Sequence, residues 1–247
     1  MNILVFVSRV PDTATKIFVG GDGKSIDPKG VKYILNPYDE LALEEGLRLK
    51  EKNGGTVTTV TVGTSESTDI LRTALAMGAD NAVIIRGTDL DSYQTAYNLA
   101  EYAKSTNYDI ILAGRQSVDF DSLQVPSLVA GMLDIPSISV VSKLEINGTQ
   151  VNAERDIEGG KEAVETSLPC LISCQKGLNE PRYPKLPDIM KAKKKPIDEI
   201  DAKEVESTVT VLDMELPSKQ RVGKILGDSD ADINEIVRRL HEDAKVI

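Results

Sequence analysis

The sequence has very few residues of the types that usually perform catalysis or bind transition metals. Its 247 residues include one histidine, His241, and two cysteines, Cys170 and Cys174. Ser-His-Asp and Cys-His catalysis need a histidine beside the nucleophile, whereas His241 stands in a charged C-terminal segment. The cysteines share one face of an apolar run, and further zinc ligands are not at hand, so we expect both to be buried apolar side chains. The sequence therefore predicts neither catalytic residues nor a metal site.

Aromatic residues and positive charge are also scarce. Tryptophan is absent, there are three phenylalanines and seven tyrosines, and the formal net charge is −10. An acidic chain with few rings is unsuited to nucleic acid or anionic membranes. The longest apolar runs, such as 3–7 and 82–85, are far shorter than the ~20 residues of a membrane span, and the chain starts with a strand pattern instead of a basic leader. We therefore expect a cytoplasmic protein without nucleic-acid or membrane partners.

Two common nucleotide-binding motifs are missing, because the chain has neither G-x-G-x-x-G nor a Walker A sequence. It contains instead an alternation of apolar runs and helical patterns. Strands are predicted at 2–8, 57–62, 82–86, 109–113 and 137–143, and helices at 37–52, 66–77, 91–105 and 122–133. The runs are continuously apolar, which is typical of strands buried on both faces. We predict an α/β fold with a doubly wound, mostly parallel sheet.

Three regions depart from this alternation. Asn147-Gly148 lies between two strand patterns and predicts a type I′ hairpin at an antiparallel edge of the sheet. The insertion at 9–35 carries a glycine-rich turn at 20–23 of the hairpin kind. At 181–196 four prolines interrupt the chain, and an extended segment at 205–226 and a helix at 230–244 follow. We predict a nucleotide-binding domain at 1–180 and, at 181–247, a loop and an arm that pack on another chain.

The stretch 109–126 is the most informative of the sequence, since a buried strand pattern ends at Gly114 and a polar loop leads into a new helix. Pro126 is tolerated only in the first turn of a helix, so the helix 122–133 is predicted to begin near Ser122. The free N–H groups of its first turn, around 123–125, would suit a phosphate. Of Asp119 and Asp121, one is then expected to be the helix N-cap, and the other a turn former or an acceptor for a ribose hydroxyl. An ordinary strand-loop-helix connection remains the alternative.

Two further turns are predicted at the same edge of the sheet. Asn36-Pro37-Tyr38-Asp39 opens the first helix, where Asn36 either caps the helix or reaches a nucleotide. Gly63-Thr64-Ser65 follows the second strand. If the strand order brings this turn beside the loop at 114–125, the turn and the loop flank one crevice. Taken alone, the turn is only the capped start of a helix.

Several stretches match one known family, and together they extend over nearly the whole chain. They are 36–40 (Asn-Pro-Tyr-Asp-Glu), 72–80 (Arg-Thr-Ala-Leu-Ala-Met-Gly-Ala-Asp), the Gly114-x-Gln116-x-x-Asp119-x-Asp121-x-x-Gln124 loop, 154–162 with 168–173, and 179–195. They resemble the beta subunits of electron transfer flavoproteins. The resemblance implies a Rossmann-like, adenine-nucleotide-binding fold and a heterodimer whose alpha subunit carries FAD. It identifies an electron-transfer subunit without catalytic residues of its own.

The resemblance also implies a nucleotide site in this subunit. With Gly63 from the neighbouring turn, the expected contacts are Phe6, Asn36, Pro37, Tyr38, Asp39, Val62, Gly63, Gly114, Arg115, Gln116, Ser117, Val118, Asp119, Phe120, Asp121, Ser122, Leu123, Gln124 and Val125. The loop matching 182–191 docks partner dehydrogenases in the family, with Leu186 at the position of the anchoring hydrophobe and Ile189 and Met190 beside it. An acyl-CoA dehydrogenase-type flavoenzyme is the expected partner.

The identity of the nucleotide depends on Leu123-Gln124-Val125. Family members that bind AMP and only shuttle electrons tend to carry Asn-Gln-Thr there, whereas Gln-Val resembles members that hold a second FAD. Such members bifurcate electrons from NADH to the alpha-subunit FAD and to an acceptor such as ferredoxin. FAD is therefore favoured here, with structural AMP as the alternative. A stand-alone module of the universal-stress-protein kind is a further alternative, against which the long arm counts.

Overall fold

The computed structural model describes residues 1–217 and 223–247. Within this range, nine strands form one sheet in the order β11-β5-β4-β1-β6-β10-β7-β8-β9. In that order the strands span Asp198–Asp201, Asn81–Arg86, Thr56–Gly63, Asn2–Phe6, Ile110–Gly114, Cys170–Cys174, Ser137–Asn147, Gln150–Ile157 and Gly160–Ser167. All pairs from β11 to β7 are parallel, and the pairs β7-β8 and β8-β9 are antiparallel. The predicted doubly wound α/β fold is confirmed.

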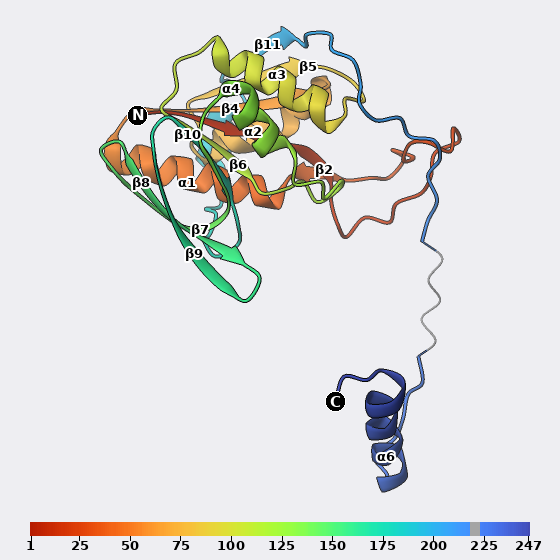
Figure 1. Ribbon diagram of the computed structural model, residues 1–247. Helices are drawn as coiled ribbons and strands as arrows, with labels where there is room; N and C mark the ends of the chain where they lie inside the picture. The colour runs from red at the N-terminus through yellow and green to blue at the C-terminus, as the bar shows by residue number, and fades with distance from the viewer. Residues whose placement is uncertain (218–222) are drawn as a thin grey trace.

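Helices cover both faces of the parallel part of the sheet (Figure 1). Ile3 and Val5 of β1 face one apolar core with α1 (Pro37–Asn53) and α2 (Thr68–Met77), whereas Leu4 and Phe6 face a second core with α3 (Ser92–Lys104) and α4 (Val125–Leu133). The strand side chains alternate between the two cores, so each central strand is buried on both sides. The continuous apolar runs of the sequence follow from this double burial.

The antiparallel end of the sheet is built by β7, β8 and β9, whose long hairpins extend beyond the helices in Figure 1. The hairpin predicted at Asn147-Gly148 is confirmed, because Asn147 pairs with Gln150. Its turn is not of type I′. Gly148 has a φ of 61°, but Thr149 does not have a positive φ, whereas type I′ needs a positive φ at both central residues.

The insertion agrees with the sequence prediction at its turn, whereas two later segments differ from it. The insertion forms a small antiparallel pair, β2 (Arg9–Pro11) with β3 (Tyr33–Leu35), around the predicted turn at 20–23, where the Gly23 N–H donates to the Gly20 carbonyl at 3.0 Å. The short strand β11 was not predicted, and it extends the sheet beside β5. Of the segment 205–226 predicted as extended, residues 218–222 lie outside the described residues, and the described part contains no strand.

The remaining helices belong to the C-terminal quarter of the chain. They are α5 (Leu186–Ala192), α6 (Asp230–Arg238) and a π-helical turn at Arg239–Asp243, which together with α6 matches the helix predicted at 230–244. Ile233, Ile236 and Val237 of α6 are exposed. No helix within the described residues has the length and apolar character that a bilayer crossing requires.

Candidate functional site

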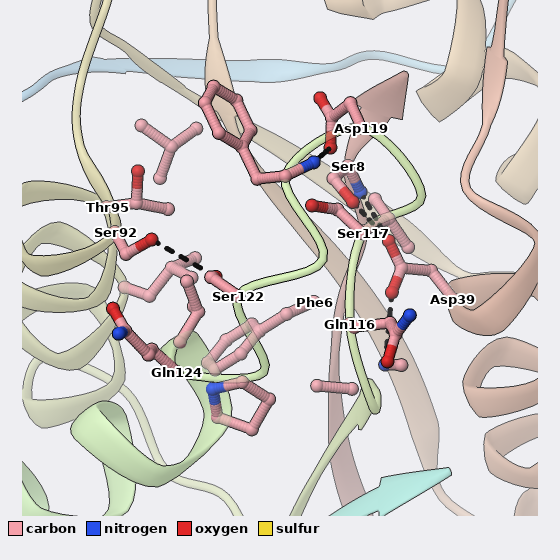
Figure 2. Close-up of a pocket in the computed structure, with 18 of the residues that line it drawn as sticks. Phe6, Ser8, Asp39, Ser92, Thr95, Gln116, Ser117, Asp119, Ser122 and Gln124 are labelled. Atoms are coloured by element: carbon pink, nitrogen blue, oxygen red, sulfur yellow. Dashed lines mark hydrogen bonds between the residues drawn. The ribbon is translucent and has the colours of Figure 1, made fainter. Parts of the chain in front are cut away.

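The site lies where the direction of strand addition reverses. The chain passes from β1 to β4 and β5 on one side and then returns to β6 on the other side of β1. At such a switch point the loops after neighbouring parallel strands separate and leave a crevice at their carboxyl ends. Here the ends of β1, β4 and β6 surround a pocket of about 290 Å³ (Figure 2). The predicted crevice between the turn at Gly63 and the loop at 114–125 is therefore present.

Most residues expected to contact a nucleotide line this pocket. They are Phe6, Asp39, Val62, Gly63, Gly114, Gln116, Ser117, Asp119, Phe120, Ser122, Leu123, Gln124 and Val125. The remaining six are not among the lining residues, namely Asn36, Pro37, Tyr38, Arg115, Val118 and Asp121. The Arg115 guanidinium lies 5.5 Å from the centre of the Tyr38 ring, and its Nε donates to Gln116 Oε1 at 2.7 Å.

Asn36 and Asp39 hold the loop after β6 against the start of α1. Asn36 is fully buried and does not cap the helix with its side chain. Its Nδ2 donates to the Gln116 carbonyl at 2.9 Å, and its Oδ1 accepts from the Val118 N–H at 3.3 Å. Of the two roles open to Asn36 from the sequence, side-chain capping is excluded. The residue shapes the pocket by fixing the backbone of its principal loop.

The Asp39 carboxylate joins the ends of the two strands that flank the switch point. One oxygen accepts from the Ser8 N–H at 2.8 Å and from the Ser8 hydroxyl at 2.5 Å, and the other accepts from the Gly114 N–H at 3.0 Å (Figure 2). Burial raises the pKa of Asp39 to about 7, although the hydrogen bonds from Ser8, Asn36 and Gly114 act in the opposite direction. The site therefore contains a buried carboxyl group that titrates near neutral pH.

Gly114 is required by the close approach of this carboxylate. A Cβ atom at position 114 would lie 2.7 Å from Tyr38 Cβ and against Asp39 Oδ1. Side chains do not tolerate such contacts without displacement of the backbone. The glycine that ends the strand pattern in the sequence therefore has a packing function at the base of the pocket.

The helix after this loop begins later than the sequence predicts. Asp121 and Leu123 have positive φ values of 54° and 56°, so the chain turns twice through the left-handed region and α4 begins at Val125, not near Ser122. Pro126 is nonetheless in the first turn, as expected. Neither aspartate is the N-cap, which is Gln124 without a side-chain cap bond. Asp119 accepts from the Phe120 N–H at 2.8 Å, and Asp121 accepts from the Gln116 side chain.

The opposite wall of the pocket comes from the β5–α3 connection and from α3 itself. The lining residues of this wall are Leu90, Asp91, Ser92, Thr95 and Leu99. The sequence did not predict that these residues belong to the site. Asp91 caps α3 in a capping box with Gln94, and the Ser92 hydroxyl lies 3.3 Å from the Ser122 hydroxyl across the pocket (Figure 2). Asp91-x-x-Gln94 directly after a predicted strand was the available signal, because the carboxyl ends of parallel strands share one edge.

The charges around the pocket decide how it can hold an anion. Among the described residues that line it, Arg9 is the only one with a basic side chain, and this guanidinium already pairs with Glu66 and Asp69 at 3.1 Å each and stacks on Tyr33 at 3.9 Å. The lining also includes three aspartates. Hydroxyls, amides and the uncapped start of α4 are left as donors. A phosphate here would therefore be bound by neutral N–H and O–H groups.

The two cysteines do not line the pocket. Cys170 and Cys174 are free and buried in β10, as predicted. Burial raises the pKa of Cys170 to about 11 and that of Cys174 well above its usual range. The described residues contain no group of three or more His, Cys, Asp or Glu side chains placed to hold a metal ion.

Comparisons with known proteins agree with this architecture. Residues 24–205 match the electron transfer flavoprotein domain. The chain is 46% identical to the electron transfer flavoprotein subunit beta of Bacillus subtilis, with both chains covered completely. It is 41% identical to the subunit of the same name from Syntrophomonas wolfei, over 90% of this chain and 88% of that one, and 38% identical to that of Mus musculus, over 90% and 91%.

Replacement of Gly114 by alanine tests the close packing under the pocket. We expect Gly114→Ala to lower the free energy of unfolding by about 1–3 kcal/mol, because the new methyl group displaces Asp39 or Tyr38. Gly131→Ala is the matched control, since nothing lies within 4 Å of its added Cβ atom in α4, and it should stabilise the helix by ~0.5–1 kcal/mol. Urea unfolding measures both. Equal stability of Gly114→Ala and the wild type would contradict the packing argument.

The raised pKa of Asp39 predicts a specific dependence of stability on pH. From the ordinary value of 3.8 up to about 7, the folded protein keeps a proton on Asp39 that the unfolded chain has lost. The contribution of this group to the free energy of unfolding therefore falls as pH rises through that window, and it is constant above it. The stability of the wild type relative to Asp39→Asn should thus decrease between pH 5 and pH 8.

The control for this measurement is Asp22→Asn. Hydrogen bonds from Lys24 and Ser25 lower the pKa of Asp22, so this carboxylate is ionised in both states throughout that range. The stability of the wild type relative to Asp22→Asn should not change between pH 5 and pH 8. A constant difference for Asp39→Asn as well would show that Asp39 does not titrate near neutral pH.

Proposed function

Because this chain belongs to the electron transfer flavoprotein family, as one of its beta subunits, we propose that it holds FAD in the pocket at the β1/β6 switch point. The family supports a role in electron transfer, association with a flavin or adenine nucleotide, and a heterodimer with an alpha subunit. The stand-alone stress-protein module loses its support, since the arm is part of the match to beta subunits over the full chain.

The donors and the size of the pocket fit the adenylate half that FAD and AMP share. Its volume of about 290 Å³ is at the lower end of the range for ligand sites. Its neutral donors suit a phosphate that has to avoid Asp39, Asp91 and Asp119. The donors of this part of the site do not distinguish the two nucleotides.

The observation that favours FAD is the apolar rim. Phe120 is 78% exposed and Leu123 is 42% exposed, and Val125 lies with them in the lining. Exposed apolar side chains in the lining suit a planar ring system that lies outside the adenylate site. Polar side chains, as in the Asn-Gln-Thr variant of this loop, would favour water there instead.

Bound FAD would supply hydride and single-electron chemistry, and the protein would hold and orient it. The bifurcating reaction is the specific form that we propose, with NADH as donor and the alpha-subunit FAD and a low-potential carrier such as ferredoxin as acceptors. A carrier with structural AMP is the second candidate, and the small volume of the pocket is the observation in its favour.

A double substitution in the rim tests the choice of nucleotide. We expect Leu123→Asn with Val125→Thr to lower the ratio of FAD to AMP affinity on the order of tenfold, because both substitutions place polar groups where the flavin would pack. Competition between FAD and AMP for the heterodimer measures this ratio. Ile157→Asn is the control, since Ile157 is exposed but outside the pocket. An unchanged ratio in the double variant would contradict the assignment of FAD.

We also propose that α5 docks a dehydrogenase. Leu186 is 74% exposed and Met190 lies one turn further on the same face, whereas Ile189 packs against the core. The helix is held at both ends. Before the helix, Arg182 Nε binds the Glu44 carboxylate at 2.8 Å. At its last residue, the Ala192 carbonyl accepts a hydrogen bond from Arg72 at 2.6 Å.

A fixed helix that presents an apolar pair is a suitable anchor for a partner, because little conformational entropy is lost on binding. Four exposed lysines surround this pair, Lys185, Lys191, Lys193 and Lys194, of which Lys191 pairs with Asp188 at 3.4 Å. They would steer an acidic surface of the partner toward the anchor.

Truncation of the anchor tests this proposal. We expect Leu186→Ala to reduce the rate constant of electron transfer between the heterodimer and an acyl-CoA dehydrogenase-type partner at least about fivefold, because a central anchor contributes more than about 1 kcal/mol. Phe18→Ala removes another exposed apolar side chain, in the insertion, and should have no effect. Transfer at the wild-type rate by Leu186→Ala, with every dehydrogenase offered, would remove α5 from the docking site.

A further inference from the structure

The first part of the C-terminal arm is fixed along helix α3. After β11 the chain runs beside this helix (Figure 1). Lys203 exchanges two backbone hydrogen bonds with the Asn98 side chain, at 2.7 and 3.3 Å. Gln94 Nε2 donates to the Val205 carbonyl at 2.8 Å. Because Asn98 and Gln94 bind backbone groups, they set the register of the arm irrespective of its side chains.

Asp91, at the start of the same helix, binds the next stretch of the arm. One oxygen of its carboxylate accepts from the Thr208 N–H at 2.6 Å, the Thr208 and Ser207 hydroxyls at 3.0 Å each, and the Val209 N–H at 3.2 Å. Its other oxygen accepts from the Gln94 N–H at 2.7 Å and caps α3. Desolvation raises the pKa of Asp91, but these hydrogen bonds outweigh it and lower the pKa to about 2. The carboxylate is therefore ionised and fully engaged.

One side of α3 contacts the arm, and the adjacent side lines the pocket. Asp91, Gln94 and Asn98 are spaced by three and four residues and form one stripe, which contacts the arm. Ser92 and Thr95 lie on the adjacent stripe and line the pocket. Asp91 belongs to both sets, because it lines the pocket and also binds residues 207–209.

We propose that Asp91 is a positioning residue that couples occupancy of the pocket to the seating of arm residues 207–209. The proposal rests on the proposed function of the pocket as an adenine-nucleotide site. A seated arm holds Asp91 and the first turn of α3 in place, and so keeps the wall formed by Ser92 and Thr95 ready for the ligand. Coupling of this kind is reciprocal, so the bound nucleotide also holds the arm.

The test changes the arm and leaves the pocket intact. Ser207→Ala with Thr208→Val removes two hydroxyl donors to Asp91, and neither residue lines the pocket. The heterodimer is freed of nucleotide, reloaded with FAD or with AMP in separate samples, and the release of nucleotide is followed after dilution. Since coupling free energies correspond to at least about a fivefold change in affinity, we expect release at least about five times faster than from the wild type.

Two variants control this measurement, and a third changes Asp91 itself. Thr210→Val makes the same chemical change two residues beyond Thr208, and Ser207→Thr with Thr208→Ser keeps both hydroxyls, so both should release nucleotide at the wild-type rate. Asp91→Asn retains a cap for α3, since asparagine caps as well as aspartate, but its amide group cannot accept all the donors of the arm. It should release nucleotide faster, and amide hydrogen exchange at 207–209 should rise with it.

The outcomes separate the two proposals. Release at the wild-type rate from the Ser207→Ala, Thr208→Val heterodimer overturns the coupling and leaves the nucleotide site in place, even if Asp91→Asn releases faster. Failure of the wild-type heterodimer to bind either FAD or AMP overturns the proposed function, and the coupling falls with it. Faster release from the arm variant alongside wild-type behaviour of both hydroxyl controls supports the coupling.

Discussion

The buried hydrogen bonds of Asp39 are the interaction on which the site depends. This carboxylate fixes Ser8, the second residue after β1, and Gly114, the last residue of β6, to the first turn of α1. Asn36 extends the same attachment to the backbone at Gln116 and Val118. A crevice forms at the switch point because the loops separate there, but its shape persists because these polar groups are buried and paired. Gly114 permits this approach, since any larger residue would occupy the space of the carboxylate.

The charge distribution follows from this construction and limits the chemistry of the pocket. Carboxylates are used as structural acceptors at Asp39, Asp91 and Asp121, each bound to backbone or side-chain donors. Arg9, which has the one basic side chain among the described residues that line the pocket, is neutralised by Glu66 and Asp69. Backbone N–H groups and hydroxyls are therefore the donors left for an anion. Asp91 lines the pocket and also binds residues of the arm.

The sequence predicts those parts of the fold that depend on burial, and fails where conformation depends on tertiary contacts. The central strands and their helices could be predicted because double burial gives continuous apolar runs. The late start of α4 could not, because positive φ at Asp121 and Leu123 is imposed by the folded loop and not by residue type. The wall at Asp91 was missed because its role depends on strand order, and β11 was missed because its charged residues, Asp198–Asp201, give no apolar pattern.

The proposal that the pocket of this beta subunit holds FAD is tested most directly by the number of FAD and AMP molecules per heterodimer, counted after release from protein co-purified with its alpha subunit. We expect two FAD and no AMP. One FAD together with one AMP would contradict FAD in this pocket.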